Sequence, residues 1–120
     1  MEHLKSVAAV KEVIQSESLT FLYIGQENCS VCHGLKPQIS KIMSAYPEVR
    51  LVELDALEVP DVAEAFRVLT VPVLILFVEG KEYLRKARIV NTMNFKQDVH
   101  KIITGYQQMR IVNEEEKTAD

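Results

Sequence analysis

The run from Val71 to Val78, which reads VPVLILFV, restricts the fold of this chain more than any other segment. It is apolar at odd and even positions alike, so a strand built from it would be buried on both faces. Strands of this kind occur in sheets that carry helices on both sides. The run therefore predicts a central strand of an α/β protein.

Apolar spacing divides the rest of the chain into alternating helices and strands. A helical period predicts helices at 6–16, 32–46, 60–66 and from 94 onward. Short runs rich in β-branched and aromatic residues predict strands at 19–24, 50–55, 71–78 and 81–89, with room for a short strand before the first helix. The alternation implies parallel pairing, and a hairpin at Glu79-Gly80 makes the predicted sheet mixed.

The C-terminal segment is predicted to change character near residue 112. Asn94 and Gln97 form a capping-box pattern, and the apolar stripe of the helix that follows extends to Met109. Residues 113–120 are acidic and contain no aromatic residue, which is typical of disordered chain. We therefore predict one domain over residues 1–112 and a disordered tail over 113–120, in keeping with a length of 120 residues.

Composition excludes several classes of function. The net charge is −3 and the basic residues are scattered, so we expect no nucleic-acid partner. No segment approaches the roughly 20 apolar residues of a membrane span. The N-terminus lacks a basic start followed by an apolar run, which predicts a cytoplasmic protein. We expect it to be a monomer.

Two cysteines, Cys29 and Cys32, form the one motif that carries obvious chemistry. Cys29 lies between a predicted strand and a predicted helix, where free amide groups and the helix dipole stabilise a thiolate. Cys32 follows one turn later and faces inward. The pair therefore predicts a thiol–disulfide redox centre, in which Cys29 attacks a partner disulfide and Cys32 resolves the mixed disulfide.

Other interpretations of the pair stay open at this stage. Two buried structural cysteines can lie three residues apart by chance. Zinc needs four ligands, and the chain has no second Cys-x-x-Cys and only dispersed histidines. Cys29 to His33 also matches the Cys-x-x-Cys-His signature of covalent haem attachment, although such attachment normally accompanies export.

The combined motifs resemble the thioredoxin family. Pro37, five residues after Cys32, matches the proline that kinks the active-site helix of that family. Thr70-Val71-Pro72 before an apolar strand matches the family's cis-proline motif, and Gly80 matches its hairpin glycine. The resemblance covers roughly residues 4–108.

The resemblance implies a fold, a site and a set of partners. The fold would be a three-layer α/β/α sandwich with a mixed central sheet. The Val71–Pro72 bond would be cis and would lie beside the cysteines, and Val71, Pro72 and Asn28 would contact the substrate. The partners would be protein disulfides and a reductase that donates electrons, and the Cys29–Cys32 disulfide would serve without any added cofactor or metal.

This chain departs from the family pattern close to the cysteines. Asn28 stands where thioredoxins have tryptophan, and Ser30-Val31 replaces the usual Gly-Pro. Tyr23 stands where the family has a buried aspartate that helps to deprotonate the resolving thiol. Glu53 on the neighbouring strand is a candidate substitute, although an exposed strand carboxylate is the simpler interpretation.

Three residues around the pair are candidates for tuning it: Glu27, His33 and Tyr23. Glu27 would disfavour a thiolate on Cys29, whereas a charged His33 would favour it. The leading functional hypothesis is a disulfide reductase acting on proteins. The alternatives are a reductase of mixed disulfides between proteins and small thiols, and a redox-sensing module that binds a partner without turnover.

Overall fold

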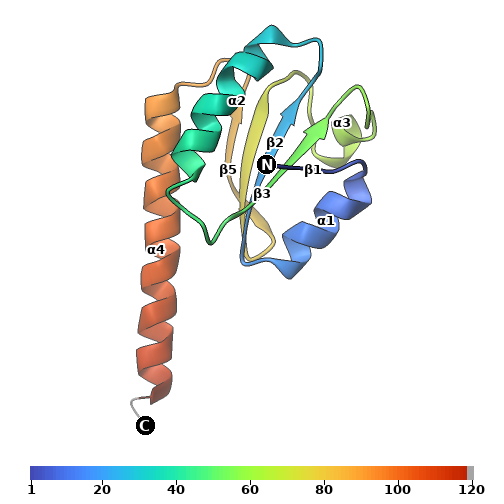
Figure 1. Ribbon diagram of the computed structural model, residues 1–120. Helices are drawn as coiled ribbons and strands as arrows, with labels where there is room; N and C mark the ends of the chain where they lie inside the picture. The colour runs from blue at the N-terminus through green and yellow to red at the C-terminus, as the bar shows by residue number, and fades with distance from the viewer. Residues whose placement is uncertain (119–120) are drawn as a thin grey trace.

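The computed structural model describes residues 1–118 and has a five-stranded sheet at its centre (Figure 1). The strands are β1 (Glu2–His3), β2 (Leu19–Gly25), β3 (Arg50–Asp55), β4 (Val73–Val78) and β5 (Lys81–Ala87). Their order across the sheet is β1-β3-β2-β4-β5. The first three strands of that order run parallel, and the β2–β4 and β4–β5 pairs are antiparallel. The predicted mixed sheet is confirmed.

Four helices cover the two faces of this sheet. They are α1 (Val7–Ser16), α2 (Ser30–Met43), α3 (Val62–Ala65) and α4 (Thr92–Thr118). Figure 1 shows α1 and α3 on one face and α2 and α4 on the other. Each face has its own apolar cluster, one containing Val10 and Val62 and the other Ile39 and Val99. The molecule is therefore a three-layer α/β/α sandwich, as the resemblance implied.

The two strands in the middle of the sheet are buried along their whole length. Every residue of β2 and β4 is buried, and Leu22 lies opposite Ile75 in their ladder. The backbone amides pair within the sheet and both faces meet helices, which favours apolar residues along both strands; Thr20 in β2 is the buried polar residue among them. The strand predicted at 71–78 is confirmed over 73–78.

The turn after β4 is held by two left-handed residues. Glu79 has a φ of 50° and Gly80 a φ of 79°, which places the predicted hairpin glycine where a side chain would be strained. β5 ends at Ala87, two residues earlier than predicted. Arg88 leaves the strand geometry with a φ of 67° and donates its backbone N–H to the carbonyl of Pro72 at 2.9 Å.

The last helix differs from its prediction at both ends. It begins at Thr92, and Asn91 caps it by accepting the N–H of Asn94 at 3.0 Å, so the expected capping box at Asn94 is wrong. It continues to Thr118, where a disordered tail was expected from residue 113; residues 119 and 120 lie outside the described chain. Continuing a formed helix with good helix formers costs little, which explains the extension.

The end of α4 projects beyond the sheet (Figure 1). Met109, predicted to be buried, is 67% exposed because the helix has run past the strands it could pack against. The extents of the molecule, 56 × 31 × 21 Å, reflect this projection. Within residues 1–118, no helix combines the length and apolar character that a membrane span needs.

Candidate active site

The turn from β2 into α2 places the two cysteines at one end of the sheet. α2 begins at Ser30, and Cys29 is its N-cap with an extended backbone, φ −101° and ψ 103°. The Sγ of Cys29 accepts the backbone N–H of Cys32 at 3.2 Å. The two sulfurs are joined in a disulfide whose Cα atoms lie 5.3 Å apart. The predicted pairing of Cys29 with Cys32 is confirmed.

The two sulfurs differ in their access to solvent. Cys29 is half-buried, whereas Cys32 is 3% exposed and belongs to the buried face of α2. A thiolate at an N-cap is stabilised by free amides and by the helix dipole. Cys29 therefore has both the access and the electrostatic support that a nucleophilic cysteine requires.

Gly25, the last residue of β2, makes room for Cys32. A Cβ atom at Gly25 would lie 3.2 Å from the Cβ of Cys32 and 3.5 Å from its sulfur. The first of these distances is shorter than an ordinary van der Waals contact. The absence of a side chain at Gly25 is therefore what lets α2 bring its buried cysteine against the sheet.

Tyr23 lies beneath Cys32. Its ring is 3% exposed and its hydroxyl donates to the backbone carbonyl of Cys32 at 2.6 Å. Burial, with a smaller contribution from the nearby Glu53 carboxylate, raises the pKa of Tyr23 to about 12. Tyr23 is therefore a neutral hydrogen-bond donor at physiological pH and cannot take up a thiol proton there. Tyr23 was predicted to tune the cysteine pair, and the structure shows it in contact with the backbone of Cys32, not with the sulfur of Cys32.

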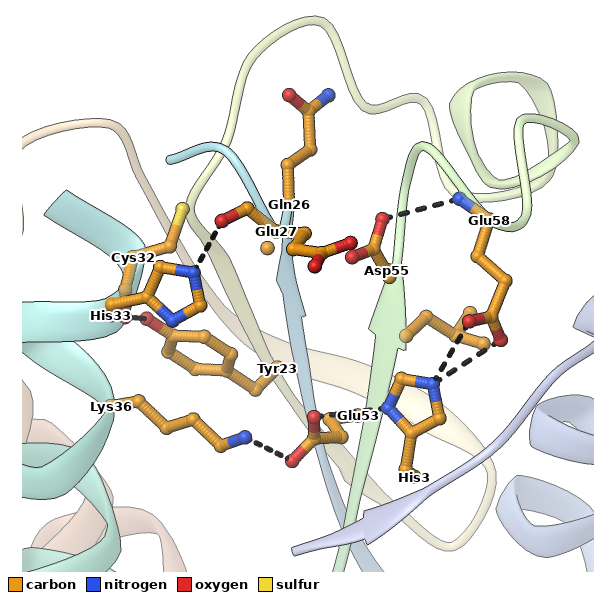
Figure 2. A pocket seen from close by; sticks show the side chains of 12 residues that line it. His3, Tyr23, Gln26, Glu27, Cys32, His33, Lys36, Glu53, Asp55 and Glu58 are labelled. Atoms are coloured by element: carbon orange, nitrogen blue, oxygen red, sulfur yellow. Dashed lines mark hydrogen bonds and ion pairs between the residues drawn. The ribbon is translucent and has the colours of Figure 1, made fainter. Parts of the chain in front are cut away.

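Glu53 is part of an ion-pair network beside Tyr23 (Figure 2). Its carboxylate accepts from Lys36 Nζ at 2.6 Å and pairs with His3 Nδ1 at 3.1 Å, and its side chain is only 16% exposed. The interpretation of Glu53 as an exposed strand carboxylate is therefore wrong. Burial alone would raise its pKa, but the hydrogen bonds from Lys36 and His3 outweigh burial and hold the pKa below its ordinary value.

His3 connects this network to the loop after β3. Its Nε2 lies 3.2 Å from a carboxylate oxygen of Glu58, on the opposite side of the ring from Glu53 (Figure 2). The hydrogen bond to Glu53 is the largest cause that raises the pKa of His3; burial, the next largest, lowers it, and the contacts with Glu58 raise it further. His3 is thus drawn toward its charged form by two carboxylates.

His33 and Glu27, the other predicted tuning residues, lie on the exposed side of the pair. The Nε2 of His33 donates to the backbone carbonyl of Glu27 at 2.6 Å, which ties the loop before Cys29 to α2 (Figure 2). This contact occupies one ring nitrogen of His33. The effect of His33 and Glu27 on Cys29 stays a prediction.

A cleft of about 290 Å³ opens beside Cys32. Cys32 lines it and Cys29 does not; the side chains drawn in Figure 2 come from α2, β2, β3, the loops that follow β2 and β3, and the N-terminal segment. The described residues contain no cluster of three or more histidine, cysteine, aspartate or glutamate side chains placed to hold a metal ion. The cleft gives solvent a path to the neighbourhood of the buried sulfur.

The Val71–Pro72 peptide bond is cis, as the resemblance implied. The ladder pairs Val73 with Ile24, so the preceding Pro72 lies level with Gly25, next to Cys32. Pro72 is buried and Val71 half-buried, and Asn28 is exposed. The substrate-binding roles of these three residues stay predictions.

Sequence reasoning missed the partners of Glu53. His3 is directly opposite Glu53 in the parallel β1–β3 ladder, and Lys36 lies one helical turn beyond Cys32 on α2. The Cys32–Lys36 spacing could have been noticed in the sequence. The meeting of His3 and Glu53 depends on β1 being the outer neighbour of β3, which only the strand order reveals.

Comparison with known proteins agrees with this architecture. The Thioredoxin family model matches residues 3–105. The Bacillus subtilis protein named thioredoxin-like protein YdfQ is 35% identical over 107 residues, which cover 89% of this chain and 96% of that protein.

Solved structures show the same fold at lower sequence identity. Thioredoxin from Plasmodium falciparum superposes with a TM-score of 0.76 at 20% identity, covering 84% of this chain and 98% of that chain. Oxidised mitochondrial thioredoxin 3 from Saccharomyces cerevisiae gives a TM-score of 0.71 at 23% identity, covering 81% and 91% of the two chains.

Proposed function

This chain belongs to the thioredoxin family, and we propose that it reduces disulfide bonds in other proteins through Cys29 and Cys32. One observation carries the proposal: the sulfur of Cys29 sits at the N-terminus of α2 with the amide of Cys32 donating to it. That contact would stabilise a thiolate on the accessible sulfur of Cys29, while the sulfur of Cys32 stays buried until the resolving step.

The reaction would proceed by two successive exchanges. The Cys29 thiolate attacks one sulfur of the substrate disulfide, a new S–S bond forms to Cys29, and the other substrate sulfur leaves as a thiolate that takes up a proton. Cys32 then loses its proton and attacks the Cys29 sulfur. The mixed disulfide breaks, the second substrate thiol is released, and the Cys29–Cys32 disulfide is left. A reductase supplies two electrons and two protons to restore the dithiol.

The second exchange is where this chain should differ from its relatives. Cys32 must lose a proton, and Tyr23, with a pKa raised to about 12, cannot accept it near neutral pH. The cleft beside Cys32 offers water, with Glu53 at its edge as an anion. We expect the proton to leave through this cleft, and the resolving step to be slower than it would be with a carboxylate in the place of Tyr23.

The proposal also covers the redox group, the substrates and the place where the protein acts. The redox group is the Cys29–Cys32 pair itself, with no additional cofactor or metal. The substrates are protein disulfides, met by a monomer in the cytoplasm. The backbone of Val71 would form hydrogen bonds with an extended segment of the substrate, as a sheet edge does when a peptide adds to it as a further strand.

The test compares turnover with trapping. The wild-type protein is assayed for reduction of insulin with a dithiol as electron donor, and a Cys32→Ser variant is incubated with cell extract to capture disulfide-linked partners. We expect steady insulin reduction and Cys29-dependent trapping, both lost in Cys29→Ser. A Cys29→Ser variant that matches the wild type in both assays would overturn the proposal.

One observation favours a second candidate function. Tyr23 is neutral and its hydroxyl donates to the backbone of Cys32, so we expect resolution to be slow and the mixed disulfide to be prolonged. Such a protein would act as a redox sensor that holds a partner. Trapping of one or two proteins by the wild type itself, with little insulin reduction, would favour the sensor over the reductase.

A further inference from the structure

An open groove runs along β4 and β5 on the face of the sheet that carries α1 and α3. It consists of two adjoining hollows of about 310 and 550 Å³, which share Arg67 and Arg85 as walls. Val73 and Ala87 form the floor of the smaller hollow, opposite one another in the β4–β5 ladder. The groove therefore follows the outermost strand pair over much of its length.

The rim of this groove is positively charged. Arg67, Arg85 and Arg88 line it, and Glu82 is the acidic residue among the described residues that line the two hollows. Glu82 is engaged by Arg85 through two hydrogen bonds of 2.7 and 3.0 Å. Arg67 and Arg88 supply charge beyond that pair. An excess of positive charge here stands out on a chain whose net charge is −3.

Arg67 and Arg88 are also held in an unfavourable backbone conformation. Their φ angles are 54° and 67°, in the left-handed region where glycine or asparagine would be relaxed. Strained residues of this kind persist where the surroundings fix them, and they concentrate at binding sites. Backbone hydrogen bonds fix both positions: the N–H of Val68 donates to the carbonyl of Ala63 at 2.9 Å, and the N–H of Arg88 donates to that of Pro72 at 2.9 Å. The two cationic side chains therefore start from fixed points on the rim of the groove.

The smaller hollow begins at the cis-proline loop. Thr70 lines it, two residues before Pro72, and Arg88 donates its backbone N–H to the carbonyl of Pro72. Leu69 and Ile89, which flank this junction in sequence, are 98% and 97% exposed. Exposed aliphatic side chains beside a charged rim are characteristic of an interaction surface.

We propose that this groove docks an acidic segment of the protein whose disulfide is reduced, with an apolar residue of that segment seated near Leu69. The proposal rests on the proposed function. The segment would extend from the substrate cysteine past the Pro72 loop and along β5, placing carboxylates against Arg67 and Arg88. Arginine suits this role because its guanidinium binds carboxylates through two parallel hydrogen bonds.

The experiment uses two synthetic peptides with the same internal disulfide, one flanked by aspartate and glutamate and the other by lysine. We expect kcat/KM for the acidic peptide to be on the order of tenfold higher, since two exposed ion pairs each contribute a few-fold. The preference should fade in high salt. An Arg67→Glu/Arg88→Glu variant should reverse the preference, and Arg67→Gln/Arg88→Gln should remove it.

A matched control separates local contacts from overall charge. Lys11→Glu/Lys101→Glu makes the same change in net charge at two exposed lysines on α1 and α4, away from the groove, and should keep the preference. Binding of the same peptides with serine in place of cysteine, followed by calorimetry, reports on docking without turnover. We expect the acidic form to bind the wild type and to lose binding in the charge-reversed variant.

The outcomes distinguish the two proposals. If both disulfide peptides are reduced equally and neither serine peptide binds preferentially, the docking site is wrong and the reductase stands. If no disulfide is reduced, the reductase proposal fails, and the calorimetry still decides whether the groove prefers acidic peptides.

Discussion

Cys29 and Cys32 lie three residues apart but in unlike surroundings. Cys29 owes its environment to the backbone: it caps α2 and accepts an amide hydrogen bond. Cys32 owes its environment to residues of β2: the missing side chain of Gly25 makes room for it, and the hydroxyl of Tyr23 donates to its backbone carbonyl. A capped helix start tolerates many neighbouring residues, whereas a packed sulfur does not. The surroundings of Cys29 therefore depend on the start of the helix, and those of Cys32 depend on particular residues of the sheet.

The largest contrast should appear in the reactivity of the two thiols. In Cys32→Ser, Cys29 should alkylate with iodoacetamide about 100-fold faster at neutral pH than Cys32 does in Cys29→Ser, because thiolate character and access both favour it. The rates are measured by mass spectrometry on native protein, with the denatured variants as the control. Equal rates in the native state would remove the contrast.

The second largest effect is expected from adding a methyl group at Gly25. Gly25→Ala places a Cβ 3.2 Å from the Cβ of Cys32, and we expect the oxidised protein to lose about 1–3 kcal/mol of unfolding free energy. Gly105→Ala is the matched control: among residues 1–118, no atom outside its chain neighbours and the adjacent backbone of α4 lies within 4 Å of the added Cβ, and it should gain about 0.5–1 kcal/mol. Urea unfolding measures both. Similar behaviour of the two variants would show that Cys32 is loosely packed.

Removal of the Tyr23 hydroxyl, which also lies next to Cys32, should have a smaller effect on stability. Tyr23→Phe takes away the donor to the Cys32 carbonyl, which we expect to cost about 1 kcal/mol of stability. Tyr46→Phe removes an exposed hydroxyl that contacts His100 at 3.1 Å, and its cost should be below about 0.5 kcal/mol. Thermal unfolding compares them. If Tyr46→Phe lowers the stability as much as Tyr23→Phe does, the buried hydrogen bond of Tyr23 contributes no more than an exposed one.

The smallest effect concerns the network beside the cleft. Glu53→Gln should cost below about 1 kcal/mol, because its partners Lys36 and His3 are partly exposed. The lowered pKa of Glu53 means that its contribution is present above its ordinary value of 4.5 and is lost as pH falls through the folded-state value. The raised pKa of His3 means that its contribution is complete below 6.5 and is lost as pH rises through the folded-state value.

The difference between wild type and Glu53→Gln should therefore be greatest between about pH 4.5 and pH 6.5. Urea midpoints measured across the pH range check this shape. A difference that stays constant into acid, below the folded-state pKa of Glu53, would show that the network does not stabilise the fold through charge.

Much of the fold could be predicted because local patterns and burial agree. The apolar run that ends at Val78 can be buried only as a strand covered on both faces, and Gly80 is suited to the hairpin turn that follows it. The errors fall where local signals compete. Asn91 and Asn94 are both residue types that cap helices well, so the sequence alone does not decide between them; in the structure Asn91 is the cap. The exposure of Met109 depends on where the sheet ends, which no helical period reveals.

The site divides in the same way. Cys29 and Cys32 could be identified from spacing, since an i, i+3 pair at a helix start brings two sulfurs together. The cis bond before Pro72 was available only through a resemblance. The partners of Glu53 could not be predicted, because His3 lies on the neighbouring strand β1 and Lys36 on the helix α2, and only the tertiary structure brings them together.

The projecting turns of α4 have a practical consequence. Figure 1 places the start of α2, which carries the redox pair, at one end of the molecule and the end of α4 at the other. A fluorophore, an affinity tag or a solid support attached to the final turn would thus be held away from the reacting sulfurs. Immobilised on an electrode by that helix, the molecule would present its disulfide outward to a dissolved partner.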